Sequence, residues 1–503
     1  MSSSSSWRWR RRIGHTPVRV RVVETDTAIV GAGITGLSTA WHLSKIRGKD
    51  APTAVVERET VGAPSQASAV NSGIIVVHER KTGLTGRLCR GSRRLYAGLH
   101  AAGHRIEYTP CGMLWVAQSA RDWAATLALG YPWWTDDDGD GGGDGGGGAG
   151  NATGARLLTA DDARALEPAL APTGIAGAVS FPQAASVHPR KALLAVRAEA
   201  LKAPGTALHE RTEVRAVTRE HTRGGGRWVL ECVRLRDRLG TTPADDGDGG
   251  GPPARFELHA RTLVLAAGGW MPYFGEQVGR KLGVVPVVGQ MWSTVPVPAA
   301  QAGAGAVPAL GRILCGMESD WAWSRQSTQD AQTGTPPKVT HPRMNGPSVA
   351  RHLYGKQTPG DGRFIFGGDR RVHYGELRPG NAHPLPRPCP GGSVAANRAH
   401  VVELLPALAD VPVERAWGGI MPFTEDGEPV IGRLDVGPGP AGPEAGGGCR
   451  CYVVGGLGSS GMMRGPEAGR LLAQLIVAEE RQDKEGVARL KGILGCADPN
   501  RWG

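Results

Sequence analysis

The sequence has no long apolar run and few cysteines. No apolar stretch in the 503 residues reaches the roughly 18 residues that a membrane-spanning helix needs, so no membrane span is expected. The eight cysteines include no C-x-x-C pair, and a chain of this length needs no disulfide staples, which favours a reducing compartment. Cys449 and Cys451 form a C-x-C pair, but no second Cys or His pair stands at ligand spacing, so a zinc site is not predicted.

Two hydrolase motifs are also missing. Neither G-x-S-x-G nor H-E-x-x-H occurs, which sets aside the hydrolases that use them.

Residues 136–150 match the first positions of a calcium loop, but Gly147 stands where that loop needs a glutamate. We therefore predict no metal site and expect residues 136–150 to be disordered. Residues 241–253 are a second low-complexity insert, which interrupts a predicted β-hairpin.

Acidic residues are absent from the first 23 positions, which contain six arginines. These six account for more than half of the formal net charge of +11, so the rest of the chain is only mildly basic. A large nucleic-acid-binding face is therefore not expected. The Ser- and Arg-rich residues 1–24 have two interpretations, a disordered tail without a role or an organelle transit peptide. A transit peptide would place the protein in a mitochondrion or chloroplast, whereas without one we expect it in the cytoplasm.

The strongest positive signal is a strand, turn, helix and strand between residues 25 and 57. The apolar run 27–30 predicts a buried strand that leads into a G-x-G-x-x-G pattern and then a helix ending near Lys45. The first glycine permits a tight turn, the second lets the backbone approach a pyrophosphate, and the third lets the helix pack close to the strand. The free N–H groups at the start of the helix would meet the phosphates.

A second predicted strand, residues 54–56, ends in Glu57. This acid follows the last glycine of the pattern by about 20 residues, the spacing at which a carboxylate accepts hydrogen bonds from an adenosine ribose. A carboxylate at the ribose disfavours NADP and leaves FAD and NAD as candidates. The expected fold class is α/β, with a Rossmann-type dinucleotide-binding domain and a second, sheet-based domain.

Three later segments suggest further contacts with a dinucleotide. The small polar residues 65–73 follow the second strand, so their hydroxyls and amides can face the cofactor. Residues 263–270 predict a buried strand that ends in small residues beside Trp270. Residues 452–462 repeat the order of strand, glycine loop and helix. The positive end of that helix would face a ligand that gains negative charge, as a reduced flavin does.

The residues predicted to contact the cofactor come from these segments and from one further strand. They are Gly31, Ala32, Gly33, Ile34, Thr35, Gly36, Glu57, Arg58, Ser65, Asn71, Ser72, Gly73, Val214, Ala266, Ala267, Gly268, Trp270, Gly456, Leu457, Gly458, Ser459, Ser460, Gly461 and Met462.

With these segments in this order, the sequence resembles the D-amino-acid oxidase family of flavoproteins, which includes glycine oxidase, sarcosine oxidase and dehydrogenase, and L-2-hydroxyglutarate dehydrogenase. The resemblance covers about residues 25–480 and rests on the glycine pattern with Glu57, and on residues 65–73, 265–270, 417–433 and 456–461. It implies extended FAD and a substrate domain whose mixed or antiparallel sheet lies over the flavin. The shared chemistry is hydride transfer to flavin N5 from a C–H bond beside nitrogen or oxygen.

The resemblance also divides the chain into domains. The predicted parts are an FAD-binding domain of residues 25–83, 186–275 and 415–482, a substrate domain of residues 84–185 and 276–414, and a C-terminal tail of residues 483–503.

The sequence departs from the family at positions that bear on the substrate and on flavin attachment. Met421 stands where glycine oxidase relatives have the arginine that clamps the substrate carboxylate. The cysteine that tethers flavin in monomeric sarcosine oxidase corresponds to Gly419, and the oxygen-activating lysine of that enzyme corresponds to Ile365. The histidine that carries flavin in some dehydrogenases falls near Val70. Noncovalent FAD is therefore expected. Ser460 replaces a histidine of the commoner glycine loop.

These features predict FAD-dependent oxidation of a small amine, N-methylated or secondary amino compound, with O2 or a quinone or flavoprotein carrier as electron acceptor. The alternatives are a 2-hydroxy-acid dehydrogenase, a NAD-dependent dehydrogenase and a non-catalytic flavin-binding or assembly protein. No general base is evident. Trp321 and Trp323 would share one face of a strand, where they could contact a cationic amine or pack in a core. The substrate-side candidates are Trp292, Trp323, His352, Tyr354, Met421 and Ser460.

Overall fold

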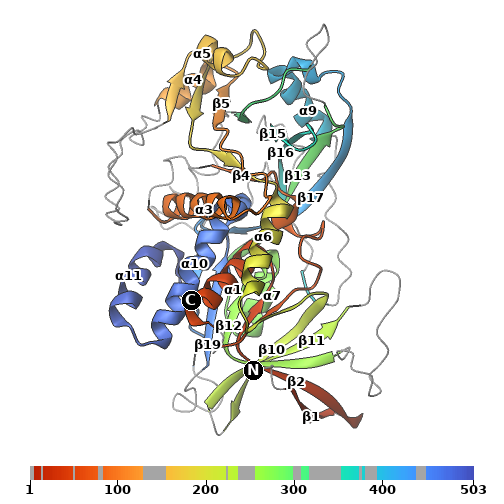
Figure 1. Ribbon diagram of the computed structural model, residues 1–503, viewed down its shortest axis with the longest axis vertical. Helices are drawn as coiled ribbons and strands as arrows, with labels where there is room; N and C mark the ends of the chain where they lie inside the picture. The colour runs from red at the N-terminus through yellow and green to blue at the C-terminus, as the bar shows by residue number, and fades with distance from the viewer. Residues whose placement is uncertain are drawn as a thin grey trace.

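Two β-sheets form the two halves of the molecule in the computed structural model, one above the other along its long axis (Figure 1). This confirms the expected α/β class with a second, sheet-based domain. The structure describes residues 5–12, 15–48, 51–76, 83–128, 155–222, 225–235, 255–297, 307–316, 353–372, 377–379, 393–437 and 449–502. Both low-complexity inserts lie outside these ranges, as do Trp321, Trp323 and His352.

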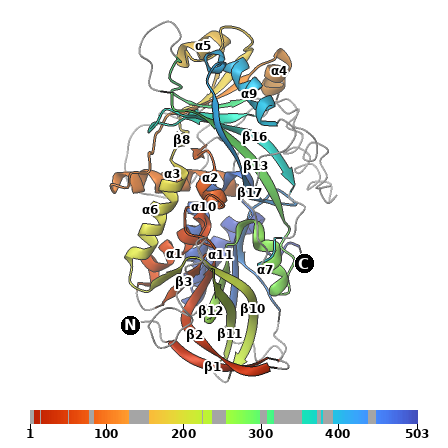
Figure 2. The same ribbon diagram turned by 90° about the vertical axis from the view of Figure 1, so that its right-hand side faces the viewer.

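The lower sheet has a parallel centre with antiparallel additions (Figure 2). Its parallel strands are β2 (His15–Val30), β3 (Thr53–Val56), β9 (Thr206–His209), β12 (Arg255–Leu265) and β19 (Arg450–Gly455). The antiparallel strands are β1 (Ser5–Arg12), β10 (Thr212–Thr222), β11 (Gly225–Arg234) and β18 (Val430–Arg433). The parallel strands are rich in Val, Leu and Ala because both faces of the sheet are covered.

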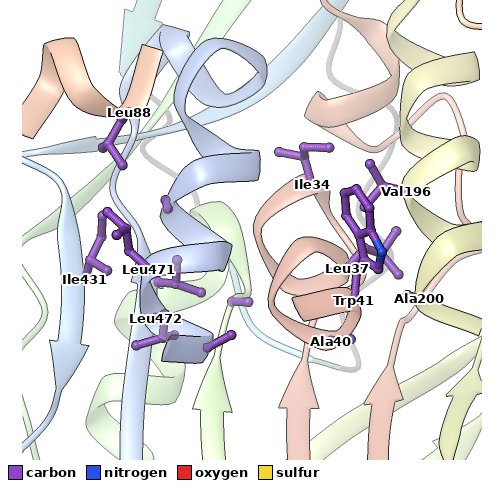
Figure 3. Packing of buried hydrophobic residues seen from close by; sticks show 14 of the residues in the cluster. Ile34, Leu37, Ala40, Trp41, Leu88, Val196, Ala200, Ile431, Leu471 and Leu472 are labelled. Carbon is purple, nitrogen blue, oxygen red and sulfur yellow. The ribbon is translucent and has the colours of Figure 1, made fainter. Parts of the chain in front are cut away.

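Three long helices cover one face of the lower sheet. They are α1 (Ile34–Arg47), α6 (Pro189–Lys202) and α10 (Gly461–Glu480). Trp41 of α1 packs against Val196 and Ala200 of α6 (Figure 3). On the other side of α1, helix α10 approaches closely because Gly469 has no side chain. A Cβ on Gly469 would lie 2.8 Å from the Thr35 carbonyl oxygen.

The ends of the chain differ from their predictions. Residues 5–12 and the first half of β2 pair as an antiparallel hairpin, so the described part of residues 1–24 differs from the disordered-tail interpretation, while the transit peptide stays a prediction. The alternation of Val and Arg over residues 18–22 is typical of a strand. The basic composition of the segment nevertheless favoured the predictions of a tail or a transit peptide. Residues 483–503 are not a simple tail, because helix α11 (Lys484–Leu494) buries Leu490 and Leu494 beside α10.

The upper sheet has eight strands in the order β17-β13-β16-β15-β14-β5-β7-β6. The strands are β5 (Met113–Ala117), β6 (Arg156–Leu158), β7 (Gly177–Phe181), β13 (Val284–Thr294), β14 (Ile313–Gly316), β15 (Tyr354–Gln357), β16 (Phe364–Val372) and β17 (Val413–Thr424). All neighbouring strands are antiparallel except β5 and β14. The outer face packs on α5 (Ala160–Leu166) and α9 (Ser393–Leu404), which leaves the inner face toward the lower half.

For two elements, the predicted domain boundaries give the wrong half of the molecule. Strand β17 pairs along its whole length with β13 and therefore belongs to the upper sheet. Helix α3 (Gly83–Ala101) packs its Leu88 and Tyr96 in the same core as α10 and therefore belongs to the helical layer of the lower half. Among the residues that the structure describes, no helix is both long and apolar enough to cross a membrane.

Candidate functional site

A cavity of about 840 Å³ lies between the two halves and receives residues from both. From below it is lined by the early glycine turn with Gly33 and by the late glycine turn with Gly461. From above it is lined by the inner face of the eight-stranded sheet. The two glycine turns, which lie more than 400 positions apart in the sequence, therefore open into one continuous slot.

The early turn is built from glycines that approach other backbone atoms. Gly31 has φ +103°, and a Cβ at this position would lie 2.5 Å from the carbonyl oxygen of Ala266. A Cβ at Gly36 would lie 2.0 Å from the Gly31 carbonyl oxygen, so α1 can pack this close only without a side chain. The N-cap residue of α1, Gly33, makes no side-chain cap, and the first N–H of the helix, that of Ile34, donates to Ser68 Oγ at 3.1 Å. Gly33, Ile34 and Thr35 line the cavity, so the positive end of α1 faces it.

Glu57 is fixed at the end of β3 by two backbone donors. Its Oε2 accepts a hydrogen bond from Ala32 N and its Oε1 accepts one from Glu59 N, each at 2.9 Å. Burial raises the pKa of the Glu57 carboxyl, while the two N–H groups and the Arg58 guanidinium oppose that rise. The Arg58 guanidinium also lies 5.0 Å from the ring centroid of Trp270. This end of the cavity has the acid that a ribose requires.

The late turn follows β19 and leads into α10. Residues 456–464 line the cavity, and α10 begins at Gly461 without a side-chain N-cap. The positive end of this helix therefore faces the cavity beside the start of α1, since a Cβ on Gly465 would lie 2.7 Å from Ile34 Cγ2.

Arg464, one turn into α10, is a cavity residue that the sequence analysis missed. Only 8% of it is exposed. Its Nη2 donates to the Leu457 carbonyl oxygen, whereas its Nε is buried without a hydrogen-bond partner. Burial lowers the pKa of Arg464, and the nearby Cys89 and Glu428 oppose this shift. A buried, incompletely paired guanidinium that lines a cavity indicates an anionic ligand.

The roof of the cavity is the inner face of the eight-stranded sheet. Its described side chains are Met113, Trp115, Met291, Ile313, Cys315, Tyr354, Ile420, Met421, Pro422, Phe423 and Thr424. Two of these, Tyr354 and Met421, were predicted on the substrate side, and Ser460 reaches the cavity from the late turn. Trp292 does not line it, because it follows Met291 in the strand and faces the outer layer, where its Nε1 donates to Asn397 Oδ1 at 2.8 Å.

Most of the predicted cofactor residues lie around this one cavity. The exceptions are Ala32, Gly36 and Gly73, which support the lining from behind. Ala32 donates to Glu57, and Gly36 lies against Gly31. Gly73 has φ +67°, and a Cβ there would lie 2.0 Å from the carbonyl oxygen of Val187. The cofactor contacts of individual residues stay predictions.

A parallel sheet with a glycine turn, a buried acid at the end of the second strand and a second glycine turn across a shared cavity define a dinucleotide-dependent oxidoreductase. The family model described as DAO, FAD dependent oxidoreductase, matches residues 26–475. The chain therefore belongs to this family of FAD-dependent oxidoreductases.

Individual relatives are distant. Glycine oxidase from Geobacillus kaustophilus is 26% identical over 470 residues, which are 90% of this chain and 93% of the relative. L-2-hydroxyglutarate dehydrogenase from Dictyostelium discoideum is 38% identical over 95 residues, 18% of this chain and 20% of the relative. Among solved structures, that glycine oxidase superposes with a TM-score of 0.61 at 23% identity, covering 90% of this chain and 95% of the other. L-proline dehydrogenase from P. horikoshii gives 0.61 at 17% identity, covering 95% and 98%.

The cofactor is FAD, and the cavity fits it in several respects. The early turn leaves no room for side chains between helix and sheet, so a diphosphate can approach the backbone. Arg464 supplies a buried cation, and the positive ends of two helices face the cavity. Bound FAD supplies the two-electron redox chemistry, and the protein supplies orientation and electrostatics.

We predict that the flavin is not covalently attached. Gly419 and Val70, the two positions that correspond to attachment residues in relatives, both line the cavity, and a Cβ on Gly419 would lie 3.3 Å from Val70 Cγ2. Neither residue carries a nucleophile. Acid precipitation of the purified protein should therefore release all of the flavin into the supernatant, as measured by visible absorbance. Yellow colour that stays with the precipitate would contradict this prediction.

Lys356, on the same face of β15 as the roof residue Tyr354 but outside the cavity lining, gives the protein a pH-dependent stability. Its side chain is 4% exposed, and its Nζ donates to the Val187 carbonyl oxygen at 2.8 Å. Burial lowers its pKa from 10.5 to about 8, and the nearby Cys111 and Glu107 oppose this shift. Between these two pH values the unfolded chain binds more protons than the folded one, so the contribution of Lys356 to stability rises with pH.

Lys356→Met should remove this dependence. The quantity to compare is the difference in free energy of unfolding between wild type and variant. We expect this difference to rise by up to about 3 kcal/mol, in favour of the wild type, from pH 8 to pH 10.5. Urea unfolding at several pH values measures this difference. Lys281→Met, which changes an exposed lysine paired with Glu425, is the control and should leave the pH profile unchanged. Parallel profiles for wild type and Lys356→Met would contradict the prediction.

Proposed function

We propose that this protein oxidises the C–H bond next to nitrogen in a small amine or N-substituted amino compound, with bound FAD accepting the hydride. The observation that carries the proposal is the chemistry of the roof. Its described side chains include no Asp, Glu or His, and the carboxylates that line the cavity (Glu57, Glu59, Glu213 and Glu428) all come from outside the eight-stranded sheet or from beyond the end of β17.

The absence of an Asp, Glu or His base from the described part of the roof favours an amine over an alcohol. An alcohol must lose its hydroxyl proton as it loses hydride, which requires a general base within hydrogen-bond reach. A neutral amine need not lose a proton in this step, because its nitrogen lone pair forms an iminium ion as the hydride leaves. The described roof supplies what the amine needs instead, because burial under apolar side chains lowers the pKa of a bound ammonium group and so favours the neutral form. The proposed electron acceptor is O2 or a quinone or flavoprotein carrier.

A 2-hydroxy-acid dehydrogenase is the second candidate. It is favoured by the 95-residue match to L-2-hydroxyglutarate dehydrogenase, which has the higher identity but covers only 18% of this chain. The match to glycine oxidase covers 90% of it. The coverage and the roof chemistry together favour the amine.

Anaerobic reduction of the flavin separates these functions. The FAD-loaded protein is mixed with N-methylated amines or with 2-hydroxy acids, and the visible absorbance is followed. We expect amines to bleach the flavin and hydroxy acids to leave it oxidised. The reverse result would replace the proposal by the second candidate. Bleaching by dithionite alone would indicate a non-catalytic flavoprotein. Admitting air to the reduced protein then shows whether O2 is an acceptor.

A further inference from the structure

The described roof is rich in sulfur-containing and aromatic side chains. Three methionines and one cysteine, Met113, Met291, Met421 and Cys315, line the cavity from four neighbouring or nearby strands of the sheet. Trp115 and Tyr354 lie among them. Strands β5, β13 and β14 contribute alternate residues to the roof and send the residues between them to the outer core, whereas the end of β17 lines the cavity with consecutive residues 419–424.

Two glycines allow the methionine side chains to lie flat across the sheet. A Cβ on Gly289 would lie 2.5 Å from Met421 Cε. A Cβ on Gly367 would lie 2.4 Å from Met291 Sδ. The long thioether side chains therefore occupy the space above positions without side chains. The apolar layer is thus closely packed, and methionine lets its surface adapt to ligands of different shape.

The charges that line the cavity lie elsewhere. Among the described lining residues the two cations are Arg58 and Arg464. Arg58 follows Glu57 at the ribose end and lies over Trp270, and Arg464 donates to the backbone of the late glycine turn. Neither belongs to the eight-stranded sheet. A carboxylate brought under the described roof would lose its hydration without gaining a cation from it, which costs several kcal/mol.

We propose that the roof selects amines with apolar substituents and no carboxylate, and that Met421 is the residue that determines this preference. The inference rests on the proposed function and deepens it by naming the substrate class. Met421 stands on β17, the edge strand of the sheet, which borders the late glycine turn, at the position that the sequence resemblance aligns with the carboxylate-binding arginine of glycine oxidase relatives. In this protein the residue at that position would disfavour a carboxylate, whereas the arginine in those relatives binds one.

Matched ligand pairs test this selection. N-Methylbenzylamine and N-methylphenylglycine differ by one carboxylate on the carbon next to nitrogen. Each is added anaerobically to the FAD-loaded protein, and both the shift of the flavin spectrum on binding and the subsequent bleaching are recorded. We expect N-methylbenzylamine to bind about 100-fold more tightly, which corresponds to about 2.7 kcal/mol.

Variants of Met421 make the test sharper. Met421→Arg should reverse the preference, because the guanidinium can pair with the carboxylate in a bidentate manner. Met421→Leu keeps an apolar side chain and should keep the wild-type preference, and Met421→Gln should weaken binding of the amine without gaining the amino acid. If Met421→Arg fails to fold, the wild type and the other two variants still decide.

The inference is overturned if the wild type binds N-methylphenylglycine as tightly as the amine or more tightly. Failure of the proposed function looks different. In that case neither compound bleaches the flavin, while the spectral shift on binding still reports which of the two the roof accepts.

Discussion

Replacing Gly36 by alanine is expected to give a protein that does not retain FAD. The added methyl group would lie 2.0 Å from the Gly31 carbonyl oxygen and 3.2 Å from the Ala266 side chain, so α1 must move away from the turn that approaches the diphosphate. We expect the affinity for FAD to fall by at least about 100-fold, on the scale of a severe core substitution. The ratio of flavin to protein absorbance after purification, followed by FAD titration of the apoprotein, measures the loss.

Two further variants separate loss of the site from loss of the fold. Gly98→Ala, on α3, places its methyl group in open space and should leave FAD binding unchanged. Gly33→Ala meets only Ser68 Oγ, at 3.3 Å, so it should fold with a normal circular dichroism spectrum but bind FAD weakly, because the methyl group lies where the backbone meets the diphosphate. Stoichiometric FAD in Gly36→Ala or in Gly33→Ala would contradict the assignment of the early turn.

Arg464→Met is expected to stabilise the apoprotein and to weaken FAD binding. Without FAD, the buried guanidinium has one hydrogen bond and an unpartnered Nε, so its removal relieves a desolvation cost of several kcal/mol. With FAD, the same change removes a cation from the cavity, and we expect a loss of about 10-fold to 100-fold in affinity, typical of a charge-assisted hydrogen bond. FAD should therefore raise the unfolding temperature of the variant by less than it raises that of the wild type, although the variant apoprotein is the more stable of the two.

Arg470→Met is the matched control for this experiment. Arg470 lies on the same helix and pairs with Glu467, but it does not line the cavity. Its loss leaves Glu467 buried without its cation and should lower the unfolding temperature with and without FAD by similar amounts. A variant of Arg464 that behaves in the same way would show that Arg464 has only a structural role.

The early nucleotide unit could be predicted because its information is local in the sequence. The glycine spacing, the helix and Glu57 fall within one continuous stretch of about 30 residues, as such units require. The late glycine turn was predicted from the same local order of strand, loop and helix. The structure adds that both turns line one cavity, which no local pattern contains.

The missed or misplaced features depend on contacts between distant segments. Period-two spacing shows that Met291 and Trp292 face opposite sides of β13, but only pairing with β16 and β17 and packing of α9 decide which side is the cavity. The sequence therefore favoured the tryptophan, whereas the structure places the methionine in the roof. Arg464 was missed in the same way, since it faces the cavity itself, and the sequence did not show that Ser68 of the small polar loop accepts from the first N–H of α1.

Strand β17 shows the same limit for domain boundaries. Its sequence runs directly toward the late glycine turn, and it was therefore assigned to the FAD-binding half. Its pairing with β13 from Val284 opposite Thr424 to Thr294 opposite Val413 makes it the edge strand of the roof. Gly419 and Met421 reach the cavity from above for this reason.

A crystal structure of the FAD-loaded protein tests the central claim most directly. We predict one FAD in extended form, with its ribose at Glu57, its diphosphate at Gly33, and its ring system between the late glycine turn and the methionine roof at Met421. A flavin ring bound outside this slot, or a roof separated from the ring by other protein segments, would contradict the account.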